Sequence, residues 1–120
     1  MSGLDRLPPN DPPGPDELDA LVVGAQLHAA MGRTRAALAL CELAVRLAPG
    51  DTRFPRLAAA MLIDADRGEE ALDHLRRIES LEGDAADRAL HLVIAFALHS
   101  AGRPGEARER FARYLDGADR

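Results

Sequence analysis

The sequence predicts an all-α fold of three antiparallel helix hairpins stacked as a short solenoid. The chain of 120 residues is 47% hydrophobic and 3% aromatic, and alanine and leucine supply most of its apolar side chains; both residues favour helices. Apolar residues recur every three or four positions, which is the period of an amphipathic helix. An alanine that follows a turn recurs as Ala37, Ala71 and Ala107, at separations of 34 and 36 residues. Such a period indicates a repeat architecture, and the length predicts one domain.

The first hairpin is predicted over residues 17–31 and 34–48. Asp16 precedes the first apolar-periodic segment and is the expected N-cap. Gly32 lies in the turn between the two helices. Pro49 ends the second helix, since proline cannot donate to the i→i−4 ladder.

The other two hairpins repeat this layout. Their helices are predicted at 53–66, 69–81, 85–101 and 104–116. Gly50 and Gly83 separate the hairpins, and Pro104 suits a first helical turn, where no N–H partner is needed. The charges of the last helix are expected to form i,i+4 ion pairs on a solvated face, such as Glu106 with Arg110.

The first 16 residues are predicted to form a flexible, acidic leader. They hold five of the eight prolines, and residues 1–19 carry a net charge of −4 out of −5 for the whole chain. Such a segment has little to bury; the alternative is a docking arm or a strap across a binding groove. The predicted organisation is thus a leader (1–16), a helical domain (17–116, with repeats at about 17–50, 51–84 and 85–116) and a short tail (117–120).

The period and its punctuation resemble the tetratricopeptide repeat over about residues 17–116. The first repeat matches best, because Gly32, Ala37, Ala44 and Pro49 take the turn, small-residue and closing positions of that family. The second repeat departs from it with Ile78 at the second small position and Gly83 where the closing proline is expected, and the third has Tyr114 at the second small position. A large residue there suits a terminal repeat that has no neighbour beyond it.

A narrower resemblance comes from size and layout. Three hairpins without another domain are similar to the small cytoplasmic chaperones of bacterial type III secretion systems, which escort export-apparatus or needle components. The acidic, proline-rich leader is not a feature of that group, and generic tetratricopeptide adaptors share most of the other features. The resemblance therefore implies a cytoplasmic chaperone for a protein client. The alternative is an adaptor, a scaffold or a module that forms homodimers through the same face.

The resemblance also implies which residues line the concave surface, because the first helix of each hairpin faces it in such stacks. Those groove positions hold Val22, Gln26, Arg53, Arg56, Ala60, Ile63, Leu92, Phe96 and His99, with Asp19 and Ala89 at their margin. This mainly apolar face suits a partner with a helical or extended apolar segment. Val22 and Gln26 stand where a carboxylate-binding clamp needs lysine and asparagine, so that clamp is not carried over.

Individual groove residues allow two interpretations. Phe96 and Ile63 are either core side chains between hairpins or anchors for a ligand. Arg53 and Arg56 are either solvated or available to acidic groups, on a partner or on the acidic leader of the same chain. Deletion of residues 1–16 tests the last of these possibilities.

No residue set in the sequence predicts an enzyme, a cofactor or a metal. None of the four histidines lies four residues from another or beside the single cysteine, Cys41, so zinc-ligand spacing is missing. The sequence has no basic face for nucleic acid and no apolar run near the ~20 residues of a membrane span. We expect a cytoplasmic location, because no secretory signal is visible and one cysteine cannot form an internal disulfide.

Overall fold

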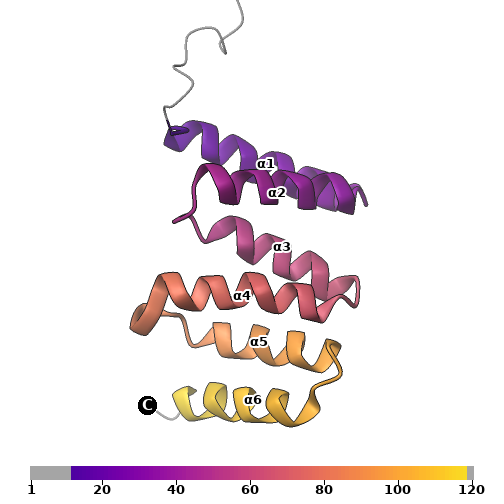
Figure 1. Cartoon of the computed structure of the whole chain (residues 1–120), viewed down its shortest axis with the longest axis vertical. Helices are drawn as coiled ribbons and strands as arrows, with labels where there is room; N and C mark the ends of the chain where they lie inside the picture. Colours follow the sequence, from indigo (N-terminus) through magenta and orange to yellow (C-terminus); the bar gives the residue numbers. More distant parts are fainter. Residues whose placement is uncertain (1–11, 119–120) are drawn as a thin grey trace, which may run out of the picture.

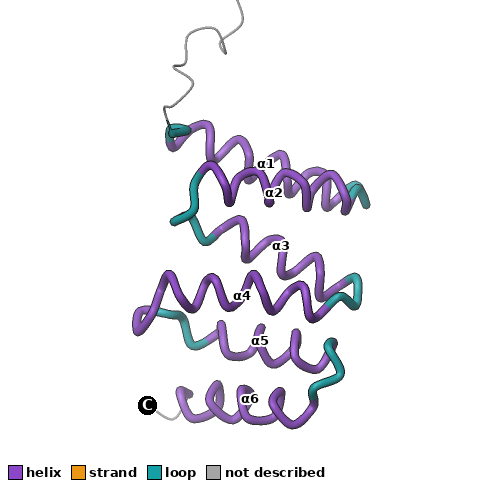
Figure 2. The backbone as a smooth tube through the Cα atoms, in the orientation of Figure 1, coloured by secondary structure: helices purple, strands orange, loops and turns teal. Residues whose placement is uncertain are grey.

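The computed structural model describes residues 12–118, which form three helix hairpins and no strand within that range (Figures 1 and 2). The α-helices are α1 (Pro15–Ala30), α2 (Thr34–Leu47), α3 (Arg53–Asp64), α4 (Gly68–Glu82), α5 (Ala89–Ser100) and α6 (Pro104–Ala118). The predicted fold class is therefore confirmed. The predicted leader falls mostly on residues 1–11, and part of the predicted tail on 119–120, which lie outside the described residues.

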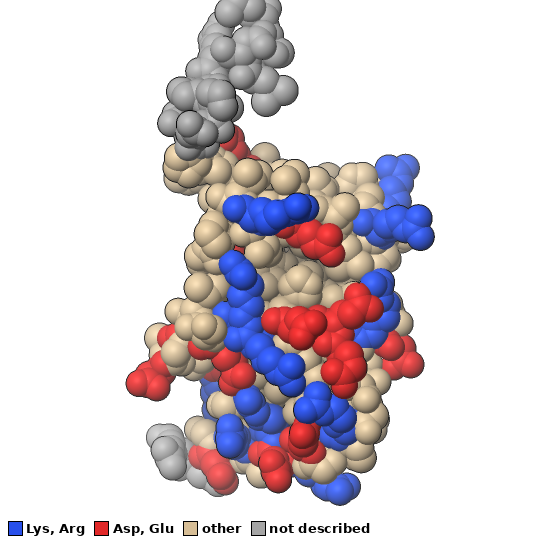
Figure 3. All heavy atoms as spheres, in the orientation of Figure 1, with Lys and Arg blue, Asp and Glu red and all other residues tan. Residues whose placement is uncertain are grey.

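The helices follow one another along the stack in chain order, from α1 at one end to α6 at the other (Figure 1). Each helix packs against the next, and the first helices of the hairpins also meet, α1 with α3 and α3 with α5. This arrangement leaves α1, α3 and α5 side by side on one surface of the stack. The opposite surface carries interspersed arginine and acidic side chains (Figure 3).

The N-terminus of α1 differs from the predicted one. The helix begins at Pro15 with Gly14 as its N-cap, so Asp16 lies inside the first turn. Proline at the first helical position needs no N–H partner, and the Glu17 carboxylate accepts the Gly14 N–H at 3.3 Å. Gly14 is thus the N-cap in place of Asp16, and Glu17 is the third helical residue whose side chain accepts the N-cap N–H.

The three turns inside the hairpins share one backbone geometry. Gly32 and Gly102 both have φ of 76°, and the equivalent residue of the middle hairpin, Asp66, has φ of 59°. Asp66 is the single non-glycine residue between 12 and 118 with a positive φ. Its carboxylate accepts a hydrogen bond from the Ser100 hydroxyl at 3.0 Å, which ties this turn to the end of α5.

The connection between the second and third hairpins is longer than predicted. A single turn of 3-10 helix, η2 (Gly83–Ala85), follows α4, and Ala86 is extended. Helix α5 therefore begins at Ala89 and not at residue 85. Asp87 supports this start, because its carboxylate accepts the Ala89 N–H at 3.0 Å.

Two buried clusters hold the stack together, and both include side chains of α3. The first core cluster joins α1, α2 and α3 through Ala25, Ala37, Cys41, Ala44, Phe54, Ala58 and Met61. The second core cluster joins α3 to α6 through Ala59, Leu62, Ala71, Leu72, Leu75, Ile78, Leu90, Ile94, Ala97, Leu98 and Ala107. The alanines of the repeat, Ala37, Ala71 and Ala107, are thus core residues that allow close helix packing.

Candidate protein-binding groove

The first helices place the predicted groove residues in equivalent rows. Gln26, Ala60 and Phe96 are separated by 34 and 36 residues, and all three are exposed. On α5 the buried residues are Leu90, Ile94, Ala95, Ala97 and Leu98. Leu92, Phe96 and His99 fall together on the side of α5 away from the core, because they are spaced by four and three residues.

Four of the nine predicted residues line one hollow at the α1–α3 end. Val22 and Gln26 of α1 and Arg53 and Arg56 of α3 surround a depression of about 360 Å³, together with Leu57. Leu57 was not among the predicted groove residues, although it lies one residue after Arg56. This end of the groove therefore combines an apolar wall with two arginine side chains.

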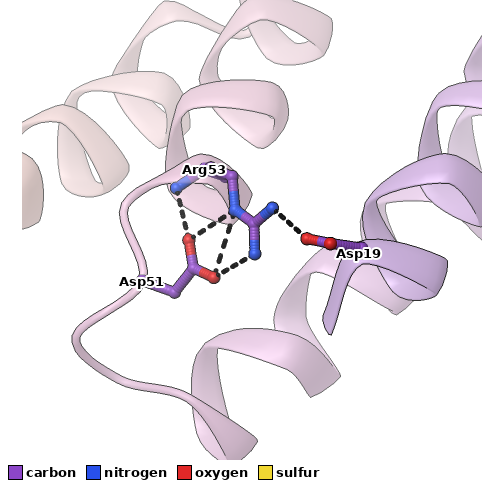
Figure 4. A network of polar contacts seen from close by, with 3 residues as sticks. All are labelled: Asp19, Asp51 and Arg53. Atoms are coloured by element: carbon purple, nitrogen blue, oxygen red, sulfur yellow. Dashed lines mark hydrogen bonds and ion pairs between the residues drawn. The ribbon is translucent and has the colours of Figure 1, made fainter. Parts of the chain in front are cut away.

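Arg53 is engaged by carboxylates of its own chain. Its guanidinium donates to Asp19 of α1 at 2.7 Å and to Asp51, in the loop before α3, at 2.7 Å (Figure 4). The Asp51 carboxylate also accepts the Arg53 backbone N–H at 3.1 Å. These hydrogen bonds hold the pKa of Asp51 below its usual range, although partial burial opposes the shift. The network ties α1 to α3 at the edge of the groove.

Arg56 is also paired within the chain. Its guanidinium donates to the Glu82 carboxylate at the end of α4 at 2.5 Å. We predicted that both guanidinium groups were either solvated or available to acidic groups on a partner or on the leader. Both are instead paired with carboxylates within the chain. The α1–α3 end is consequently close to neutral, and its exposed apolar surface dominates what a ligand would meet.

The far end of the groove is apolar and accessible. Phe96 is 56% exposed and belongs to neither core cluster, so its interpretation as a core residue was wrong. Ile63 differs, because it is half-buried and packs against the second core cluster. Leu92 is half-buried and His99 is exposed. The α5 part of the predicted groove therefore presents one exposed aromatic ring, Phe96, beside the half-buried Leu92.

A second hollow, which sequence analysis missed, lies between α4, α5 and α6. Its floor is formed by Leu72, Leu75, Ile94 and Leu98, and its volume is about 290 Å³. Arg110 at its wall pairs with Glu79 of α4 at 2.7 Å, so the predicted i,i+4 pair of Arg110 with Glu106 was wrong. Glu106 pairs instead with Arg103 at 2.6 Å. No local pattern in the sequence indicates this hollow, because its walls meet only when the hairpins stack.

Reactive groups are sparse in the part of the chain from 12 to 118. No group of three potential metal-ligating side chains occurs there. Cys41 is fully buried in the first core cluster, and burial raises the pKa of its thiol to about 11. A protonated buried thiol is a poor nucleophile. No described helix is both long and apolar enough to cross a membrane.

Comparison with known proteins agrees with the repeat geometry. A family model described as "Tetratricopeptide repeat" matches residues 17–119. A search of the curated proteins found no match to this sequence.

Proposed function

Because the chain belongs to the tetratricopeptide-repeat family, and is thus a protein–protein interaction module, we propose that it is a cytoplasmic chaperone for a protein client. In this proposal the groove of α1, α3 and α5 covers an apolar segment of the client, helical or extended. The client stays soluble until it is handed on. We assign the chain no catalytic role and no cofactor.

The exposed Phe96 is the observation that carries this proposal. A phenylalanine side chain can bury about 150–250 Å², yet this ring is more than half exposed on the groove side of α5. Buried aromatic anchors commonly dominate protein interfaces. With Arg53 and Arg56 neutralised internally, the groove favours an apolar ligand over an acidic one.

We further propose that the client is a component of a type III secretion apparatus, an export-apparatus or needle protein. The support is the three-hairpin size and the apolar groove, which resemble the small chaperones of those systems. The alternative is an adaptor that holds two folded partners. A chaperone forms an equimolar complex with one client, whereas an adaptor captures two different folded proteins.

Site-specific photo-crosslinking tests the groove assignment. A benzoylphenylalanine at Ala60, an exposed position in the middle of the groove, should give one major client adduct in cells that carry the protein. The same probe at Glu109, which is exposed on α6 and lines the other hollow, should give none. Adducts from Glu109 in place of Ala60 would refute the groove as the binding surface.

A further inference from the structure

The outer face of α1 is apolar and uncovered among residues 12–118. Val23, Leu27 and Met31 are 52%, 57% and 59% exposed. On the adjoining α2, Leu43 and Leu47 are 43% and 45% exposed. We call this surface the end face, formed by Ala20, Val23, Gly24, Leu27 and Met31 of α1 and by Leu40, Leu43 and Leu47 of α2.

Two residues of the end face, Ala20 and Leu27, occupy positions that are buried in the next hairpin. Ala20 and Leu27 correspond, 34 residues later, to Phe54 and Met61, which are 0% and 8% exposed. Phe54 and Met61 lie in the first core cluster, where α2 covers them. The outer face of α1 therefore has the chemistry of a surface on which another helix layer packs.

The second helix of the first hairpin strengthens this contrast. Leu40, Leu43 and Leu47 correspond to His74, Arg77 and Leu81 of α4, and to Arg110, Arg113 and Gly117 of α6. The apolar series is thus specific to the end of the stack that begins with α1. Leu43 and Leu47 are exposed about one helical turn apart on this terminal layer, and a contiguous exposed apolar patch of this kind marks an interaction surface.

Gly24 lies in the middle of this face, and internal packing does not require a glycine there. A Cβ atom at Gly24 would meet only the Leu40 Cδ1 atom at 3.8 Å, an ordinary contact. A glycine inside a helix lowers its stability relative to alanine. A glycine at position 24 would instead allow a helix of another molecule to approach α1 closely.

Charges at the two ends of α1 are of opposite sign. Asp16 and Glu17 lie in its first turn, and Arg33 follows its last turn, whereas residues 20–32 contain no Asp, Glu or Arg. No ion pair joins these three charged side chains to another residue in the described part of the chain. In Figure 3, blue side chains accordingly gather over the α1–α2 turn.

We propose that two copies of this chain pack end face to end face, with their α1 helices antiparallel. Antiparallel packing sets Asp16 and Glu17 of one copy beside Arg33 of the other at both rims, whereas parallel packing would oppose like charges. The same patch on both copies gives a closed two-fold dimer. The groove residues Ala60 and Phe96 are not part of this contact.

A head-to-tail stack is the competing arrangement for a second copy. The other end of the stack exposes Phe111 and Leu115, by 44% and 47%. However, Arg108 stands there at the position equivalent to Leu38 and Leu72, so the surface is less apolar. Head-to-tail contact would also propagate into an open chain of copies.

Sedimentation equilibrium of the full chain at several concentrations tests the dimer. We expect a monomer–dimer equilibrium whose dissociation constant rises by roughly a hundredfold in Leu27→Glu, because a central interface side chain becomes charged. Leu115→Glu, at the other end of the stack, is the control and should leave the constant unchanged. A monomer at every concentration overturns the proposal, and so does an assembly larger than a dimer that Leu115→Glu abolishes.

Charge reversal tests the antiparallel geometry without altering the apolar patch. A variant with Asp16→Arg and Glu17→Arg should dimerise weakly, because both rims become basic. A variant with Arg33→Glu should also dimerise weakly, because both rims become acidic. An equimolar mixture of the two variants should form a heterodimer, detected by energy transfer between dyes on each. No heterodimer on mixing would overturn the antiparallel pairing.

These outcomes are independent of client binding. If no dimer forms but a probe at Ala60 still crosslinks to a client, the dimer proposal is rejected and the groove proposal is kept. If the dimer forms and no client is found, the groove proposal is rejected and the dimer proposal is kept.

Discussion

Gly68 offers a sharp test of how the second and third hairpins pack. It is buried at the start of α4. A Cβ atom there would lie 2.4 Å from the Ala97 carbonyl oxygen and 2.6 Å from the Ala101 nitrogen, both backbone atoms of the α5 end. The substitution Gly68→Ala therefore requires α4 and α5 to separate, because neither contact can be relieved by a side-chain rotation.

The expected loss follows from two opposing effects. Overpacking of a filled interior costs about 1–3 kcal/mol, and backbone contacts on this scale place Gly68→Ala in the upper part of that range. Replacing glycine by alanine in a helix returns at most about 1 kcal/mol. We expect a net loss of about 1–2 kcal/mol in the free energy of unfolding. At roughly 4–8 °C per kcal/mol, this loss corresponds to a decrease in Tm of roughly 4–16 °C.

Thermal and urea unfolding followed by circular dichroism measure this loss. Gly105→Ala is the matched control, because Gly105 lies one residue into α6 and a Cβ atom there meets nothing within 4 Å; it should be neutral or slightly stabilising. A Tm for Gly68→Ala equal to or above that of the wild type would refute the close contact between α4 and α5.

Three further predictions concern the turn, the thiol and a histidine. Asp66→Gly should raise the free energy of unfolding by about 0.5 kcal/mol in urea titrations. Glycine relieves the positive φ, which costs an L-residue about 1–2 kcal/mol, but the substitution also removes the hydrogen bond from Ser100. A decrease of more than about 1 kcal/mol would mean that the lost hydrogen bond outweighs the relieved strain. Cys41 should resist iodoacetamide at pH 8.5 in the native state and react on unfolding, because its pKa is raised to about 11; modification as fast as in denatured protein would contradict its burial. Burial lowers the pKa of His74, so the native state favours the neutral ring, and stability should fall as the pH drops below 6.5. His74→Gln should reduce that fall, and equal pH profiles for the two proteins would exclude His74 as its source.

Much of the fold could be predicted because its signals are local. Gly32 and Pro49 delimit helices by backbone geometry alone, and the recurring Ala37, Ala71 and Ala107 mark sites where only a small side chain permits close packing. The start of α5 was misplaced, because the apolar pattern does not show that residues 83–85 form a 3-10 turn and that Ala86 is extended.

The groove was less predictable, because its properties depend on contacts between distant residues. The pairs Arg53 with Asp19 and Arg56 with Glu82 join residues 34 and 26 positions apart, and they form only when the hairpins stack. Phe96 lies in a helix that is apolar on nearly every side, so periodicity could not decide which face is buried. The structure resolves this ambiguity by exposing the ring.

The most direct test of the groove is capture of the client by three matched proteins. We would purify the wild type, Phe96→Glu and Phe111→Glu from cells that carry the protein natively. Light scattering would give the mass of each complex, and mass spectrometry would identify its components. Both substitutions place a charge at an exposed phenylalanine, but only Phe96 lies on the groove side. We predict that wild type and Phe111→Glu retain one equimolar client, that Phe96→Glu loses it, and that all three keep the same helix content. Retention of the same client by Phe96→Glu would contradict binding of the client in the groove of α1, α3 and α5.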